Sequence, residues 1–110
     1  MPFFGYQNYI VETPSMHPTI PKYSIVYVKE LNEEEKKELK VDDIVAISTT
    51  GKPLLHRIIE VNQEEGFIIT QGDQNQTPDQ PVAYEKVIGL NVLVIPYIGI
   101  LFSSIYPGLI

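Results

Sequence analysis

Short runs of β-branched and aromatic residues, separated by turn-forming residues, recur along most of this chain. Residues 24–29, 43–49 and 54–61 are the clearest of these runs, and a Gly-Lys-Pro turn lies between the last two. Val, Ile and Tyr favour strands, whereas Gly, Pro, Asn and Asp favour turns. Further strands are expected at residues 9–11, 67–70 and 86–94. The pattern predicts a small, mainly β domain whose coiled sheets close partly on themselves, like an incomplete barrel.

One charged segment, residues 31–40, breaks this pattern. Asn32 is followed three residues later by Glu35, which is the spacing of a helix-capping box. Glu33 and Lys37 have the i,i+4 spacing that pairs side chains on a helix. We predict one short, solvent-exposed helix or helical loop here. The mixed charge signs favour this interpretation over an acidic binding patch.

The composition limits the classes of function. The chain has 110 residues, 44% of them hydrophobic, which is typical of one folded domain with its own core. Its net charge of -6 disfavours binding to nucleic acid, because no basic face is implied. The chain has no Cys, and its two His lack metal-ligand spacing. We therefore predict no disulfide, no metal and no other cofactor.

The two ends of the chain are low in charge. Residues 1–10 contain neither a charged n-region nor a long apolar run, so they do not resemble a signal peptide. Residues 91–110 carry no charge, but prolines and glycines interrupt them. Such interruptions disfavour a continuous spanning helix. We expect a final buried strand and then an exposed apolar tail, which suggests contact with lipid or a chain cut from a longer one.

A serine and a histidine are the first candidates for chemistry. Ser15 lies in a turn between Pro14 and Pro18, and His56 lies within the apolar segment 54–61. Serine is a weak nucleophile until a base removes its proton, and an imidazole, whose usual pKa is near ~6.5, suits that task. The alternatives are a serine that only forms a turn and a histidine that is only a hydrogen-bonded core residue.

The strand that carries His56 is expected to be covered on both sides. By alternation, Leu54, His56 and Ile58 share one face and Arg57 points to the other, and both faces are mainly apolar. His56 and Arg57 then each need a polar partner. Asp73 and Asp79 lie in the polar loop that follows residues 67–70. Either aspartate could orient the imidazole or merely stabilise its own turn, and spacing alone does not choose between them.

Taken together and in order, several motifs resemble those of the type I signal peptidases. They are Ser15-Met16-His17-Pro18-Thr19-Ile20, Asp43-Ile44-Val45-Ala46, His56-Arg57, Gly72-Asp73-Gln74-Asn75 with Asp79, and Pro96-Tyr97-Ile98-Gly99. The similarity extends from about Val11 to Gly99. It implies the archaeal and endoplasmic-reticulum branch, because His56 stands where the usual bacterial enzymes carry Lys.

The resemblance implies a role for each of the reactive residues. Ser15 would be the nucleophile and His56 the general base. Asp79, six residues after Asp73, would orient the imidazole, with Asp73 in support. The implied fold is the coiled-sheet, partly closed barrel of signal peptidases and self-cleaving repressors.

The resemblance also implies how substrate would be held. The Thr13 hydroxyl and the Ser15 N–H would stabilise the oxyanion, and Met16 would line the substrate cleft. His17 falls at a variable position and is expected to be solvated. The chain departs from the family in having Pro14 where Gly is usual and Gln74 where Asn is commoner. Pro14 has no N–H and a fixed φ, which stiffens the approach to Ser15.

The activity implied is that of an endopeptidase that removes signal peptides from exported preproteins. It would act through an acyl-enzyme on the outer (trans) face of a cell or endoplasmic-reticulum-type membrane. Its partners would be signal peptides, membrane lipid and other membrane subunits, without nucleic acid. The family's N-terminal membrane helix has no counterpart here, so residues 1–110 are interpreted as a single catalytic domain without its anchor.

Two alternatives remain open from the sequence. One is a non-catalytic β-module, an inactive relative within a membrane complex. The presence of Pro14 where the family usually has Gly would be consistent with this alternative. The other is a self-cleaving regulator with a Ser-Lys pair. That reaction needs a lysine base, and Lys52 lies in a turn and not at the matching strand position.

Overall fold

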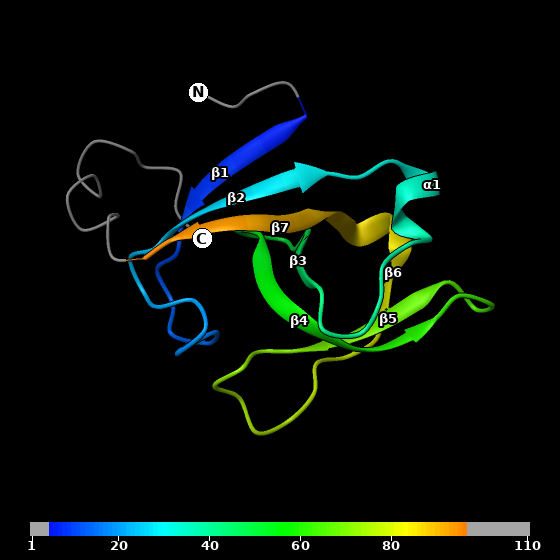
Figure 1. Cartoon of the computed structure of the whole chain (residues 1–110). Coiled ribbons are helices and arrows are strands. Elements are labelled where there is room, and N and C mark those ends of the chain that lie inside the picture. The colour runs from blue at the N-terminus through cyan, green and yellow to red at the C-terminus, as the bar shows by residue number, and fades with distance from the viewer. Residues whose placement is uncertain (1–4, 97–110) are drawn as a thin grey trace.

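The computed structural model describes residues 5–96, which form one curled antiparallel sheet with a single short α-helix (Figure 1). The strand order in this seven-stranded sheet is β1-β2-β7-β3-β4-β5-β6. The elements are β1 (Tyr6–Ile10), β2 (Ile25–Glu30), α1 (Glu33–Lys36), β3 (Ile44–Ile47), β4 (Leu54–Asn62), β5 (Phe67–Gln71), β6 (Val82–Ala83), the 3-10 turn η1 (Tyr84–Lys86) and β7 (Val87–Ile95). The predicted mainly β, partly closed architecture is confirmed.

The core lies on both sides of strand β3. Val45 and Ile47 belong to one buried cluster, and Ala46 between them belongs to the other. Alternation along a strand produces this division, because successive side chains point to opposite faces. The first cluster consists of Val11, Met16, Ile20, Val26, Val28, Ala46 and Leu55. The second consists of Leu39, Val45, Ile47, Ile58, Ile68 and Val87.

The predicted capping box is present at the start of α1. The Asn32 side chain accepts the Glu35 N–H at 2.8 Å, and the Glu35 carboxylate accepts the Asn32 N–H at 3.0 Å. These bonds satisfy N–H groups that a helix start leaves without intrahelical partners. The Asn32 N–H bond, together with Lys29, lowers the pKa of Glu35. The capping signal was therefore sufficient to locate this helix.

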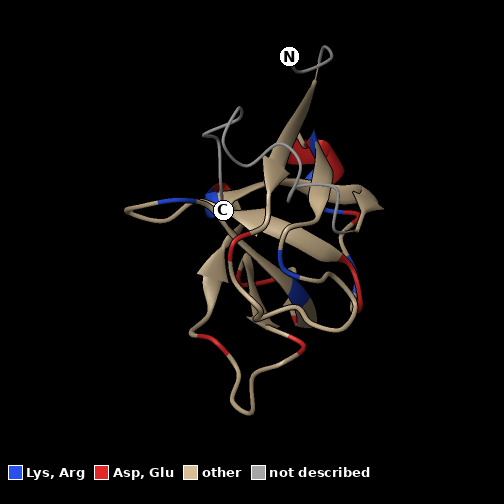
Figure 2. Cartoon of the chain, turned by 90° about the vertical axis from the view of Figure 1, so that its left-hand side faces the viewer, with Lys and Arg blue, Asp and Glu red and all other residues tan. Residues whose placement is uncertain are grey.

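The predicted pairing of Glu33 with Lys37 is wrong. Glu33 pairs with Lys36 at 3.2 Å, and Lys37 pairs with Glu34 at 3.5 Å. Both pairs have i,i+3 spacing, because α1 ends at Lys36 after only one turn. Figure 2 shows that charged residues lie mainly in α1 and the loops, whereas most of the strands contain none.

The strand β4 departs from its predicted burial beyond Ile58. Its first half is covered on both faces as expected, since Leu55, His56 and Ile58 are buried. A register shift between Ile58 and Glu60 then interrupts the pairing with β5, and Ile59 is 40% exposed. An extra residue in one strand bends it and turns side chains outward, a local feature that alternation alone does not reveal.

The last strand is only half buried. Val87 and Gly89 are buried, but Val92 and Leu93 face solvent, so the expectation of a buried final strand is wrong for the second half of β7. The predicted apolar tail begins in β7, and its part from Tyr97 onward lies outside the described residues. No helix within residues 5–96 is long and apolar enough to cross a membrane.

Gly89 supports a testable prediction about sheet packing. A Cβ at this position would overlap the backbone carbonyl of Lys29, whereas a Cβ at Gly51 would meet nothing within 4 Å. We expect Gly89→Ala to lower the free energy of unfolding by about 1–3 kcal/mol or more, because β2 and β7 must separate. Gly51→Ala is the control and should change it by less than about 0.5 kcal/mol.

Urea unfolding followed by circular dichroism measures both changes. Equal midpoints for the Gly89→Ala and Gly51→Ala proteins would contradict the close approach of β2 and β7.

Candidate active site

Ser15 lies in a tight turn that follows β1. The Pro14 carbonyl accepts the His17 N–H at 2.9 Å and closes the turn around the serine. The Ser15 carbonyl accepts the Gln74 N–H at 2.8 Å, from the loop after β5. Two segments far apart in the sequence therefore fix the backbone of Ser15. Pro14 fits the turn because no N–H is required of it there.

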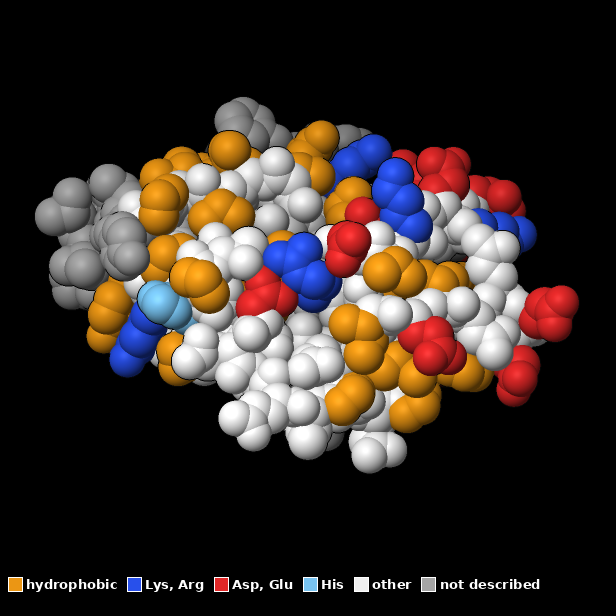
Figure 3. Space-filling model, turned by 60° about the horizontal axis from the view of Figure 1, so that its bottom comes forward, with side chains coloured by type: hydrophobic (Ala, Val, Ile, Leu, Met, Phe, Trp, Pro, Cys, Tyr) orange, Lys and Arg blue, Asp and Glu red, His pale blue; other side chains and the backbone are white. Residues whose placement is uncertain are grey.

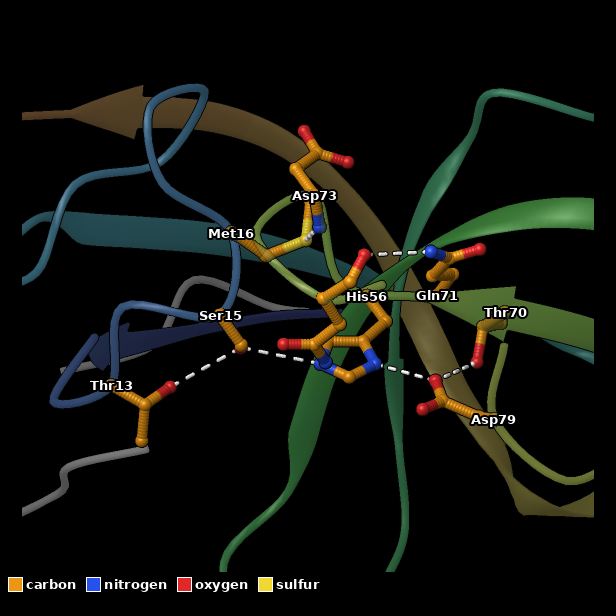
Figure 4. A network of polar contacts seen from close by, with 9 residues as sticks. Thr13, Ser15, Met16, His56, Thr70, Gln71, Asp73 and Asp79 are labelled. Carbon is orange, nitrogen blue, oxygen red and sulfur yellow. Dashed lines mark hydrogen bonds and ion pairs between the residues drawn. The ribbon is translucent and has the colours of Figure 1, made fainter. Parts of the chain in front are cut away.

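A chain of polar contacts joins Ser15 to His56 and Asp79 (Figure 4). The Ser15 Oγ lies 3.2 Å from His56 Nε2, and His56 Nδ1 lies 2.5 Å from Asp79 Oδ2. His56 is 3% exposed, so both nitrogens of its ring depend on these protein partners. A nucleophile, a base and an acid that orients the base occur here in the order that acyl transfer requires.

Asp79 is held by Thr70, which sequence analysis did not identify. The Thr70 hydroxyl donates to Asp79 Oδ2 at 2.8 Å, and the Asp79 N–H donates to the Thr70 carbonyl at 2.8 Å. Thr70 is fully buried near the end of β5. The available signal was its position in the alternating run Ile68, Thr70, Gly72, where a polar residue faces the interior.

The structure places Asp73 against Arg57 and not against the imidazole. Arg57 Nε and Nη2 donate to the two carboxylate oxygens of Asp73 at 2.9 and 2.8 Å. The hydrogen bonds from this guanidinium hold the pKa of the Asp73 carboxyl below its usual value. They also raise the pKa of Arg57. Arg57 therefore finds the polar partner that its strand position demands, and the two loop aspartates are separated.

Gly72 is the point of closest approach between the loop and the site. A Cβ there would lie 2.7 Å from the Ser15 carbonyl oxygen and 2.9 Å from His56 Nε2. Such distances are far inside ordinary contact, so any side chain would displace the serine or the imidazole. The motif Gly72-Asp73 thus combines a residue without a side chain and a residue that anchors the loop to Arg57.

Thr13 and Met16 flank the serine. The Thr13 hydroxyl lies 3.4 Å from Ser15 Oγ, and within the described residues the Ser15 N–H has no protein acceptor. Met16 is only 1% exposed, and its sulfur accepts the Asp73 N–H at 3.4 Å. Met16 therefore ties the serine turn to the Gly72-Asp73 loop, and it also lines a cavity beside Ser15. His17 is exposed, as expected.

An open cavity of about 290 Å³ lies beside Ser15. Its lining is mainly apolar, and an ion pair between Lys52 Nζ and Glu12, 2.7 Å apart, lies at its margin. The lining residues are Val11, Glu12, Thr13, Ser15, Met16, Lys52, Pro53, Leu54 and Leu55.

Within residues 5–96, no three His, Asp or Glu side chains gather as metal ligands. On the face shown in Figure 3, basic side chains lie among acidic ones instead of forming one basic patch.

Comparison of the chain with protein-family models, with curated proteins and with solved structures finds no match.

The Arg57–Asp73 pair leads to a prediction about stability and pH. Asp73→Asn should lower the free energy of unfolding at pH 7 by about 1–3 kcal/mol, because it breaks a two-bond charged contact. The pKa of Asp73 is depressed in the folded protein, so its contribution is fully present above the unfolded value near ~3.9 and is lost as pH falls below it. The difference between the free energies of unfolding of the two proteins should therefore shrink as pH falls from about 5 into strong acid, through the depressed pKa of Asp73.

Urea unfolding at several pH values measures this gap. Glu64→Gln, which removes one exposed carboxylate elsewhere, is the matched control and should differ little from the unaltered chain at any pH. A gap that stays constant from pH 7 to acid would contradict the contribution assigned to the ionised Asp73.

Proposed function

We propose that this chain is a serine endopeptidase that works through an acyl-enzyme. The single observation that carries the proposal is the contact chain from Ser15 Oγ through both nitrogens of His56 to Asp79, beside an apolar cavity. The finer proposal, which the sequence resemblance supports, is that its substrates are the signal peptides of exported preproteins. It would then belong to the Ser-His branch of the type I signal peptidases.

In the proposed reaction, Ser15 Oγ attacks the scissile carbonyl carbon while its proton passes to His56 Nε2. The imidazole becomes positively charged, and the ionised Asp79 at Nδ1 stabilises that charge and keeps the ring oriented. His56 then gives the proton to the leaving amine as the C–N bond breaks. Water, deprotonated by the same nitrogen, hydrolyses the ester and restores the serine.

The oxyanion of the tetrahedral intermediate needs donors that are free before substrate arrives. The Ser15 N–H meets this requirement within the described part of the chain, and the nearby Thr13 hydroxyl can turn toward the same point. Removing one such donor costs about 2.7–4 kcal/mol in a well-studied serine protease. Pro14 cannot supply a third donor, so we assign the oxyanion to these two groups.

The apolar lining of the cavity favours an uncharged, extended substrate. Its apolar lining would accept a small side chain next to the scissile bond, and the segment before Ser15 could align an extended peptide beside it. We place the enzyme at the outer face of a membrane, with lipid and other membrane subunits as partners. Exposed Val92, Leu93 and Ile95 at the end of β7 support contact with an apolar environment.

The contacts of Lys52 disfavour the Ser-Lys alternative. Lys52 lines the same cavity as Ser15, but its ammonium is paired with the Glu12 carboxylate. His56 Nε2, and not the Lys52 amine, lies within hydrogen-bond distance of Ser15 Oγ. The hydrogen-bonded imidazole is the better-placed base.

Cleavage of a purified preprotein in liposomes tests the proposed function. We expect a single cut after a small residue, lost on Ser15→Ala and reduced by at least about 10³-fold on His56→Gln. Lys52→Met should retain most of the activity, because the amine takes no part in the proton transfer. Cleavage that survives Ser15→Ala, or that depends on Lys52 more than on His56, would contradict the proposal.

The two loop aspartates should differ in their effect on turnover. Asp79→Ala removes the group that faces His56 Nδ1, and we expect kcat to fall by at least about 100-fold. Asp73→Ala removes a group that contacts Arg57 and not the imidazole, so it should lower kcat less when measured at a temperature where both variants remain folded. Steady-state kinetics on the same preprotein measures kcat for both variants. A larger loss of kcat in Asp73→Ala than in Asp79→Ala would refute the assignment of Asp79.

A further inference from the structure

Thr70 is placed on the same face of the sheet as His56 by the pairing of β4 with β5. Ile58 lies opposite Thr70 in this register. His56 lies two residues before Ile58, so its side chain is on the same face of the sheet. Gly72, two residues after Thr70, also approaches His56 Nε2 closely, as expected for a residue on this face. In Figure 4 the Thr70 side chain reaches Asp79 from the side away from the imidazole.

The Thr70 hydroxyl and the imidazole share one carboxylate oxygen. Thr70 Oγ1 donates to Asp79 Oδ2 at 2.8 Å, and His56 Nδ1 lies 2.5 Å from that same atom. The backbone of Asp79 is already held, because its N–H donates to the Thr70 carbonyl. The hydroxyl bond therefore restrains the rotation of the carboxylate on a backbone that a separate bond already holds.

A carboxylate at this position needs such a restraint. The Asp79 side chain is 25% exposed, so water can compete for its oxygens and the group can turn about its Cβ–Cγ bond. Two donors on Oδ2, from a buried threonine and a buried histidine, oppose that rotation. Hydrogen bonds to a charged group are the stronger ones in proteins.

We propose that Thr70 is a positioning residue for the reaction, holding Asp79 Oδ2 against His56 Nδ1. Its effect on catalysis rests on the proposed function, whereas its effect on the His56–Asp79 contact does not. As the proton moves from Ser15 to His56, positive charge develops on the ring, and a fixed carboxylate stabilises that charge without reorganising. Loss of the hydroxyl should therefore lower kcat and leave KM almost unchanged.

The test compares Thr70→Val, which keeps the shape but loses the hydroxyl, with Thr70→Ser, which keeps the hydroxyl. Ser24→Ala is the matched control, because Ser24 is also fully buried and its hydroxyl donates to the Pro21 carbonyl at 2.6 Å. Each protein is labelled with ¹⁵N-histidine for NMR and assayed on the same preprotein. Exposed His17 is the reference signal in every spectrum.

We expect Thr70→Val to weaken or shift upfield the Nδ1–H resonance of His56 and to lower kcat by about 10- to 100-fold, with KM within about twofold. Thr70→Ser should restore both, and Ser24→Ala should alter neither. If the valine variant does not fold, the pair Thr70→Ser and Thr70→Ala makes the same comparison of hydroxyl with no hydroxyl.

An unchanged His56 resonance in Thr70→Val, or an equal loss of kcat in Ser24→Ala, would overturn the positioning role. If the His56 resonance depends on Thr70 but the unaltered chain does not cleave the preprotein, the contact is upheld and the proposed function is rejected. Failure of the positioning role and failure of the proposed function therefore give different results.

Discussion

The burial of one imidazole is the constraint on which the rest of the site depends. His56 lies inside a sheet, and a buried ring with two polar nitrogens must find a partner for each. Ser15 supplies one partner and Asp79 the other, at distances short enough to transfer and stabilise a proton. The same requirement explains Gly72, because a side chain there would occupy the space that the ring and the serine turn need.

The loops around the imidazole are held to one another and not only to the sheet. Gln74 binds the Ser15 carbonyl, Met16 accepts the Asp73 N–H, and Arg57 holds Asp73 by two bonds. The segment that carries the nucleophile and the segment that carries the acid are thus joined to each other, and Arg57 ties the second segment to β4, the strand that carries the base. Such mutual support is what keeps a reactive arrangement in register, since a displacement of about 1 Å already impairs catalysis.

Much of the fold could be predicted from the sequence, because local chemistry decides it. The capping box of Asn32 and Glu35 located the helix, and the β-branched runs located most of the strands. Strand β6 was missed, since its two residues form too short a run to produce a pattern. The outward turn of Ile59 was missed too, because a bulge depends on how two strands pair.

The candidate site was predicted in part. Ser15, His56 and the two loop aspartates were singled out by residue type and by resemblance, but type and spacing could not separate Asp73 from Asp79. That separation depends on Arg57, which reaches Asp73 from the opposite face of β4 and removes it from the imidazole. The role of Thr70 likewise follows from strand register and loop packing, which become visible only in three dimensions.

Covalent labelling with a fluorophosphonate tests the central claim most directly, because it reports the reactivity of one hydroxyl without requiring the natural substrate or a membrane. Intact-mass spectrometry and peptide mapping of the labelled chain would locate the adduct. The account predicts a single adduct on Ser15, absent in Ser15→Ala and formed at least about 100-fold more slowly in His56→Gln. An unlabelled Ser15, or labelling at an unchanged rate without the imidazole, would contradict it.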